Sequence, residues 1–237
     1  MTDYPAWQPN PNEYAATNIA ALAQRVGVSS YEALHQWSVD HRAEFWAEAI
    51  ADLGIVFQTP PADILDLANG VEHPAWLPGA HLNIVESCFA APPDAIAVVH
   101  RRDGRLLRLT YADLLAEVQG FAAGFAESGL RPGDAVAIAM PMLLEAVVAY
   151  LGIIHAGGVV VSIADSFAPD EITTRLRIAN AKAIVTQDAM VRAGRTLPMF
   201  EKVVTADGPM AIVVPTGADV RLREGDVYWD DFVGSGP

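Results

Sequence analysis

The second half of the chain alternates short, continuously apolar runs with longer segments of helical period. The runs AVAIAM (135–140), VVVSI (159–163) and KAIVT (182–186) have the length of single strands and carry few polar residues. Strands buried on both faces of a sheet have this composition, and helices connect them when they are parallel. The alternation therefore predicts an α/β fold, in which a mostly parallel sheet is covered by helices on both faces.

Local signals indicate where several helices begin and end. Thr110 and Asp113 form a capping-box pattern at the start of a long helix. Proline suits the first turn of a helix, so we expect helices to begin at Pro141 and Pro169. The pair Gly157–Gly158 is interpreted as a helix end that leads into a strand, rather than as a phosphate cradle.

The segments on either side of this region carry weaker signals. After KAIVT we expect a short helix, and then strands near residues 202–205 and 211–214. Two further apolar runs, 95–100 and 106–109, flank Asp103–Gly104, a dipeptide that favours a tight hairpin turn. We therefore expect an antiparallel hairpin ahead of the parallel strands.

Composition divides the chain into three parts. Residues 1–28 carry several prolines near the N-terminus and are expected to form an extended arm. Residues 29–81 comprise a small helical cap, with a capping-box pattern at Ser29 and Glu32, and a proline-rich connector. Residues 82–237 form the α/β part.

The charge balance and the cysteine content exclude several classes of partner and site. There are 15 Lys and Arg against 29 Asp and Glu, which gives a formal net charge of −14. General affinity for nucleic acid or an anionic membrane needs positive surface and is not expected. The single cysteine, Cys88, excludes an intrachain disulfide, and its apolar surroundings predict a buried structural thiol. No apolar run reaches the length of a membrane span and no secretory signal is found, so a cytoplasmic location is the default.

The common catalytic and metal-binding motifs are missing from the sequence. There is no GxxxxGK phosphate loop, no GxGxxG after a strand, no HExxH and no GxSxG. His35 and His41 lie six residues apart, which favours packing or surface roles over metal ligation. The pair Asp230–Asp231 has no basic neighbour and is interpreted as a solvated turn. We therefore assign no catalytic residue and no metal ligand.

Two arginines are the candidate binding residues. Arg192 and Arg195 are three residues apart, and on a helix they would share one face. Two adjacent guanidinium groups repel each other unless carboxylates or a bound anion compensate their charge. From the residues alone, an ordinary surface ion pair is favoured over an anion site.

Four long segments have the character of family motifs, in order along the chain. They are YEALHQWSVDHRAEFWAE (31–48), WLPGAHLNIVESCF (76–89), LTYADLLAEV (109–118) and the stretch 133–188. With these segments the chain resembles the AMP-forming acyl-activating enzymes, in particular the acetyl-CoA-synthetase branch. The first two resemble the N-terminal cap and the WFPGAxLNxxEN segment of that branch, and the last two resemble the superfamily's first two core motifs. The resemblance extends from about residue 30 to 233 and is closest to the acyl-activating enzymes typified by plant peroxisomal members.

This resemblance implies an AMP-forming acyl-CoA ligase with the adenylate-forming fold. In the family, a carboxylic acid reacts with Mg–ATP to give an acyl-adenylate and pyrophosphate, and the thiol of CoA then displaces AMP. The family's Ser/Thr/Gly-rich phosphate loop, its adenine- and ribose-binding set and its C-terminal lysine have no counterpart in the chain. We therefore expect the N-terminal part of a longer synthetase, truncated before the phosphate loop and inactive alone. The alternatives are a stand-alone, non-catalytic binding or regulatory module, and an interaction protein that uses the proline-rich arm.

The resemblance also implies a role for the arginine pair. In the acetyl-CoA-synthetase branch the VRAGR segment supplies two arginines that approach the 3′-phosphate of CoA, and these match Arg192 and Arg195. Acetate-type members carry a Gly-Gly pair against CoA where this chain has Asp165 and Ser166. Because an aspartate adds negative charge near a polyanion, the CoA path can differ there. The implied partners are a carboxylic acid, ATP, CoA and the rest of the same polypeptide, while the acid and an oligomeric state stay open.

Overall fold

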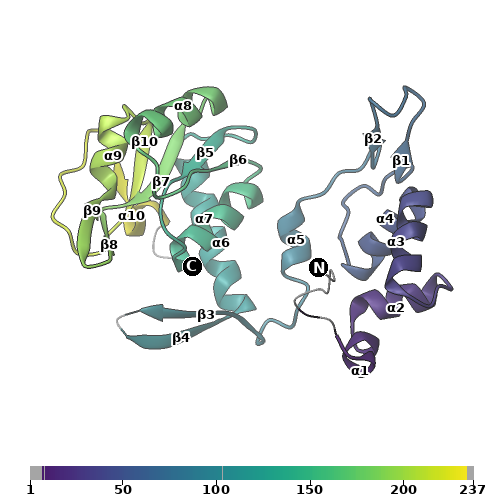
Figure 1. Ribbon diagram of the computed structural model, residues 1–237. Helices are drawn as coiled ribbons and strands as arrows, with labels where there is room; N and C mark the ends of the chain where they lie inside the picture. The colour runs from purple at the N-terminus through teal and green to yellow at the C-terminus, as the bar shows by residue number, and fades with distance from the viewer. Residues whose placement is uncertain (1–6, 8, 103, 234–237) are drawn as a thin grey trace, which may run out of the picture. The chain divides into compact units, whose positions relative to one another are not determined.

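The computed structural model describes residue 7, residues 9–102 and residues 104–233. The chain divides into two compact units, Met1–Leu82 and Asn83–Pro237, whose helices and strands are drawn in Figure 1. The division lies beside the boundary at residues 81–82 that composition suggested.

The first unit is a small group of helices followed by a connector. Its helices are α1 (Pro11–Ala15), α2 (Asn18–Arg25), α3 (Tyr31–Asp40) and α4 (Arg42–Asp52), and a short antiparallel pair, β1 (Leu65–Asp66) and β2 (Ala75–Trp76), lies in the connector. The core of this unit is small: Leu22, Ala23 and Leu34 are buried, and Trp37 and Phe45 pack against them.

The extended arm expected over residues 1–28 is wrong for its described part, because α1 and α2 form there. Asn10 caps α1: its side chain accepts hydrogen bonds from the backbone N–H groups of Asn12 and Glu13, and the Glu13 carboxylate accepts one from the N–H of Asn10. Pro11 takes the first helical position, where proline is favoured. This proline therefore begins a helix instead of extending the chain. Residues 1–6 and 8 of the predicted arm lie outside the described residues.

The cap of α3 lies one residue later than predicted. Ser30 is the N-cap, and its hydroxyl accepts a hydrogen bond from the N–H of Ala33 at 3.1 Å. Ala33 has no polar side chain that could reach back to the cap, so the capping box expected from Ser29 and Glu32 does not form.

A five-stranded parallel sheet is the centre of the second unit. Its strands are β5 (Ala135–Ile138), β6 (Val159–Ser162), β7 (Ala183–Gln187), β10 (Met210–Val214) and β11 (Val227–Tyr228). They lie in the order β11-β10-β7-β5-β6, and every neighbouring pair is parallel. The strands β5, β7 and β10 are buried almost throughout, as the mostly apolar composition of their runs predicted.

Helices cover both faces of this sheet, which confirms the predicted α/β class (Figure 1). On one face lie α5 (Ile84–Cys88), α6 (Tyr111–Glu127), α7 (Leu144–His155) and α10 (Trp229–Val233), and on the other lie α8 (Pro169–Ala179) and α9 (Met199–Thr205). Successive strand residues point to opposite faces, so Val136 and Ile138 of β5 pack with the first group and Ala137 packs with the second. No helix in the described parts of the chain is long and apolar enough to cross a membrane.

The predicted start of α6 is confirmed. The hydroxyl of Thr110 accepts a hydrogen bond from the N–H of Asp113, and the Asp113 carboxylate accepts one from the N–H of Thr110. Pro169 begins α8 as expected, whereas α7 begins at Leu144, three residues after Pro141. Capping patterns and prolines thus predicted the first residue of each of these helices to within one helical turn.

Gly157 and Gly158 close α7, as predicted. The N–H of Gly157 donates to the carbonyl oxygen of Ile154, and the N–H of Gly158 donates to that of Ile153. Gly157 has a positive φ of 79°, a conformation that glycine adopts without strain. The pair therefore donates hydrogen bonds to carbonyl groups of the last turn of the helix and connects it to β6. This role is structural.

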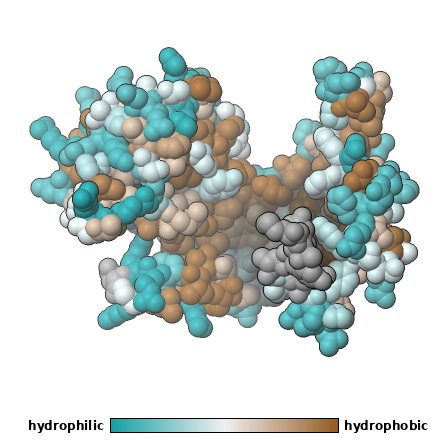
Figure 2. All heavy atoms as spheres, viewed as in Figure 1, coloured by the Kyte–Doolittle hydropathy of each residue, from teal (hydrophilic) through white to brown (hydrophobic). Residues whose placement is uncertain are grey.

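An antiparallel hairpin, β3 (Ile96–Arg102) and β4 (Arg105–Thr110), precedes α6, as the two apolar runs predicted. Asp103 of the predicted turn lies outside the described residues, while Gly104 has a positive φ of 76°. The free end of this hairpin is hydrophilic (Figure 2).

The strand expected near residues 202–205 is wrong, because α9 covers this segment. Met199, Phe200 and Val203 recur at helical spacing, and all three are buried. The strand expected over 211–214 is confirmed as β10.

Candidate functional site

The carboxyl ends of β5, β7 and β10 meet at one edge of the sheet, because these strands are parallel neighbours. A cavity of about 520 Å³ lies at this edge. Its walls come from the segment after β5, the end of β7, the hairpin that follows β7 and the loop after β10: Pro141, Leu143, Gln187, Ala189, Met190, Val191, Thr196, Thr216, Gly217 and Ala218. Ligands of open α/β sheets bind at this edge.

The hairpin in the cavity wall consists of β8 (Ala189–Arg192) and β9 (Arg195–Pro198). Ala193 and Gly194 connect the two strands, with φ values of 50° and 74°. Positive φ at both positions is typical of the tight turn whose twist matches that of the flanking strands. The short helix expected after KAIVT is therefore wrong, because the Ala-Gly pair folds the chain back on itself.

This turn places the two candidate arginines opposite each other. Arg192 and Arg195 are cross-strand partners beside the turn, so the hairpin register, and not a shared helix face, brings them together. Like charges in such a pair repel each other. Nη2 of Arg192 donates to Oδ2 of Asp165 at 2.6 Å, which compensates one of the two charges. Arg195 is exposed and has no ion-pair partner among the residues that the structure describes.

Asp165 lies in the segment that follows β6 and is held by two basic residues. Its side chain is 17% exposed, against 53% for that of Arg192. Nζ of Lys202, on α9, donates to the backbone carbonyl oxygen of Asp165 at 3.1 Å. In a chain with a formal net charge of −14, such a local group of cations is a place where a small anion can bind.

A second carboxylate, Asp188, is buried directly after β7. It is the last residue of the family-like stretch 133–188, but it was not among the site residues predicted from the sequence. It accepts hydrogen bonds from the N–H groups of Thr216, Gly217 and Ala218 at 2.8, 3.0 and 2.9 Å, and from the hydroxyl of Thr216. Burial by itself raises the pKa of Asp188, but these bonds and one from the N–H of Ala189 outweigh it and hold the pKa below its usual value. The ionised carboxylate thus ties the loop after β10 to the start of the hairpin. The available sequence signal is an acid directly after a buried strand that begins with the apolar residues Ala183–Val185.

Gln187, the last residue of β7, adds a polar group to the cavity wall. Its Nε2 donates to the carbonyl oxygen of Ala189 at 2.6 Å. Its Oε1 is buried and accepts no hydrogen bond within the described residues. An amide oxygen in this state can accept a hydrogen bond from a ligand.

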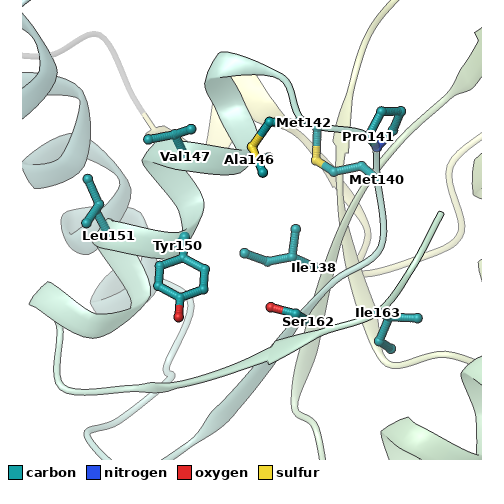
Figure 3. A pocket seen from close by; sticks show the side chains of 10 residues that line it. All are labelled: Ile138, Met140, Pro141, Met142, Ala146, Val147, Tyr150, Leu151, Ser162 and Ile163. Atoms are coloured by element: carbon teal, nitrogen blue, oxygen red, sulfur yellow. The ribbon is translucent and has the colours of Figure 1, made fainter. Parts of the chain in front are cut away.

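A separate apolar hollow of about 350 Å³ lies where β5 and β6 end beside α7 (Figure 3). Its lining is Ile138, Met140, Pro141, Met142, Ala146, Val147, Tyr150, Leu151, Ser162 and Ile163. The side chains of Ile138, Tyr150 and Ser162 point into the same space (Figure 3). This lining offers no carboxylate or amine, so the hollow suits contact with an apolar group.

Two residues singled out in the sequence are placed differently from expectation. Cys88 is exposed, so the predicted buried thiol is wrong. In the five-residue helix α5, Val85 near the start is buried, whereas Cys88, the last residue, is exposed. Asp230 and Asp231 are solvated as expected, but they form the first turn of α10, where acidic side chains are favourable.

The histidines of the first unit have packing and surface surroundings. His41 stacks on Trp37, with ring centroids 5.6 Å apart. Its Nδ1 lies 3.9 Å from a carboxylate oxygen of Glu44. Within the described ranges, no group of three or more His, Cys, Asp or Glu residues is arranged to hold a metal ion.

Two family models match the chain, one after the other. The model described as the acetyl-coenzyme A synthetase N-terminus matches residues 31–88, and the model described as AMP-binding enzyme matches residues 85–228. The chain belongs to the AMP-binding enzyme family. This confirms the family that the four sequence segments suggested. The matched residues include the parallel sheet and the arginine hairpin of the second unit.

Relatives of the chain are named for acyl activation or for the synthesis of an acyl-CoA. The chain is 37% identical to the probable acyl-activating enzyme 17, peroxisomal, of Arabidopsis thaliana, over 98% of the chain and 36% of the relative. It is 38% identical to the hexanoyl-CoA synthase of Cannabis sativa, over 97% of the chain and 35% of that relative. The acetoacetyl-CoA synthetase from Streptomyces lividans has a similar structure, with a TM-score of 0.85 and 27% identity over 99% of this chain and 38% of that one. The chain thus spans about a third of the length of its curated relatives.

Proposed function

We propose that this chain is the N-terminal part of an AMP-forming acyl-CoA synthetase. In the complete enzyme a carboxylate attacks the α-phosphate of ATP, which gives an acyl-adenylate and pyrophosphate. The thiol of CoA then attacks the acyl carbonyl carbon and AMP leaves. The family and the names of the relatives support this reaction class, and the match to a synthetase N-terminus supports the position within the enzyme.

The hairpin β8–β9 supports a role in holding CoA. Arg192 and Arg195 stand opposite each other beside a tight turn, at the edge of the sheet where ligands of such folds bind. A phosphate monoester carries close to two negative charges, and two guanidinium groups present several donors that match its oxygens. We therefore assign the arginine pair to the 3′-phosphate of CoA.

ATP and Mg²⁺ belong to the proposed reaction, and we assign neither to residues of this chain. The described residues include no group of three or more carboxylate, imidazole or thiol side chains placed around a metal. Adenylation is expected to need the remainder of the longer enzyme, since the chain spans about a third of its relatives.

The test of the CoA contact is the double variant Arg192→Ala/Arg195→Ala in the full-length enzyme. A hydrogen bond to a charged group contributes about 1.5–3 kcal/mol, so the KM for CoA is expected to rise about 10- to 100-fold. Dephospho-CoA lacks the 3′-phosphate, and its KM is expected to change by less than about threefold. The double variant Arg105→Ala/Arg108→Ala is the matched control, because it removes two exposed arginines from β4 of the other hairpin.

Equal changes in the KM values of CoA and dephospho-CoA would show that the arginines do not contact the 3′-phosphate. The reaction itself is tested by pyrophosphate release from the full-length enzyme with ATP and a panel of carboxylic acids. Absence of release with every acid in the panel would contradict the synthetase assignment.

For the location we propose the cytoplasm. The single cysteine, Cys88, is a free and exposed thiol, a state that reducing compartments preserve. Because the Arabidopsis relative is named as peroxisomal, imaging of a tagged full-length protein beside a peroxisomal marker is the deciding measurement. Co-localisation with the marker would overturn the cytoplasmic assignment.

A further inference from the structure

The site formed by Arg192, Arg195 and Lys202, called the anion site below, also contains a negatively charged side chain. The arginine pair and Lys202 form the basic side of the site, and Asp165 is the acid that contacts two of these three residues. The carboxylate of Asp165 binds Arg192 with the short distance of a charge-assisted hydrogen bond. An anionic ligand of Arg192 therefore meets a site that already holds a carboxylate.

The fold fixes Asp165 more firmly than it fixes Arg192. The aspartate side chain is 17% exposed, and Lys202 holds its backbone carbonyl at 3.1 Å. The arginine side chain is 53% exposed and stands beside the hairpin turn, so it is the partner that can move. A phosphate can bind Arg192 in two ways. It can draw the guanidinium group away from Asp165, or it can share that group with the Asp165 carboxylate and lie next to its negative charge.

We propose that Asp165 is an internal counter-ion that competes with the anionic ligand for Arg192 and so sets the affinity of the arginine pair for phosphate. The inference deepens the proposed function, on which it rests for the identity of the ligand as CoA. The ion pair between Asp165 and Arg192 is a contact of the structure and does not depend on which anion binds.

The expected size of the effect follows from two contributions. Breaking a partly exposed ion pair lowers ligand affinity by at most about fivefold. Repulsion between the aspartate and a dianionic phosphate a few ångströms away adds a comparable factor at high dielectric. Removal of the Asp165 charge is therefore expected to tighten phosphate binding by about five- to twentyfold.

The experiment is a titration of the chain and of Asp165→Asn with inorganic phosphate, followed by NMR of the arginine guanidinium signals. Phosphate is expected to bind Asp165→Asn about five- to twentyfold more tightly than the unaltered chain. In an Arg192→Ala background only the direct repulsion between Asp165 and the phosphate remains, so the same substitution is expected to change the Kd by no more than about fivefold. Asp165→Ser removes the same charge with a different side chain, and agreement between the two variants excludes an effect of the asparagine itself.

Asp230→Asn is the matched control, since it removes one negative charge from an exposed position on α10. The inference is overturned if both Asp165 variants leave the phosphate Kd unchanged or fail to bind phosphate. It is also overturned if the gain in phosphate affinity is undiminished without Arg192 or is equalled by that of Asp230→Asn.

A second titration separates this inference from the proposed function. The Kd of CoA is expected to fall in Asp165→Asn as the Kd of inorganic phosphate does. The Kd of dephospho-CoA is expected to change by less than about twofold. If CoA and dephospho-CoA bind every variant equally while the phosphate response persists, the counter-ion role stands and the CoA assignment fails.

Discussion

Asp188→Asn is expected to destabilise the second unit, because the loop after β10 depends on this one carboxylate. The two oxygens of Asp188 accept hydrogen bonds from three consecutive N–H groups, those of residues 216–218, as well as from the hydroxyl of Thr216. Asparagine keeps one acceptor oxygen and replaces the other with an NH2 group, which is a donor. Oδ2 accepts from all three backbone N–H groups of the loop, and Oδ1 accepts from the N–H of Ala189. In either orientation of the asparagine amide its NH2 group therefore faces a backbone donor, and the three loop N–H groups lose their charged acceptor.

The magnitude follows from the surroundings of these bonds. A hydrogen bond to a buried charged group contributes about 1.5–3 kcal/mol. The three N–H groups lie in a partly buried loop and can partly exchange the carboxylate for water, so about 1 kcal/mol each is appropriate. The total is about 3 kcal/mol, or a decrease in Tm of about 6–12 °C for a domain of this size.

The pH dependence gives this prediction a second signature. The folded-state pKa of Asp188 lies below the ordinary value of 3.8, so the folded state holds its proton less tightly than the unfolded state. The stabilisation is therefore fully present above the ordinary pKa and is lost as the pH falls through the folded-state pKa. The difference in unfolding free energy between the unaltered chain and Asp188→Asn should stay constant from pH 7 to about pH 5 and narrow below about pH 4.

The assay is urea unfolding of both proteins, followed by tryptophan fluorescence, at several pH values. Asp230→Asn is the control, because this exposed acid is expected to change stability by no more than about 0.5 kcal/mol. Asp226, whose pKa is also lowered by Arg223 and by backbone N–H groups despite its burial, is present in both proteins and cancels in the comparison. A difference below about 1 kcal/mol at pH 7, or one that does not narrow in acid, would refute the account of Asp188.

Two further predictions concern packing and exposure. Gly124→Ala places a Cβ 2.0 Å from the carbonyl oxygen of Phe232, so α10 must move away from α6, and urea unfolding should show a loss of about 2–3 kcal/mol. Gly120→Ala, on the same helix, brings its Cβ only to 3.2 Å from the carbonyl oxygen of Val233, and a loss as large as that of Gly124→Ala would contradict the steric explanation. Cys88 is exposed, so a disulfide reagent should modify one thiol per native chain without denaturant, and reaction only after unfolding would show that the thiol is buried.

The features predicted correctly from the sequence are those whose cause lies within one segment. A strand buried on both faces is mostly apolar, so the apolar runs of β5, β7 and β10 indicated a covered parallel sheet, although β7 ends in the buried polar residues Thr186 and Gln187. A helix must satisfy its own terminal N–H and carbonyl groups, so Thr110 with Asp113, and the glycine pair after α7, marked helix ends. The same local reasoning failed where two local interpretations competed, as in VRAGR, where a spacing of three fitted a helix and the Ala-Gly turn formed a hairpin.

The sequence predicted residues of the candidate site but not their arrangement. The sequence specified which two arginines to examine, but their geometry depends on the register of the hairpin. The partner of Arg192 is Asp165, 27 residues away, and the loop donors to Asp188 are 28 to 30 residues away. These contacts form because parallel strands bring the ends of distant segments to one edge of the sheet, and nothing in the local pattern of charge or hydrophobicity records which ends will meet.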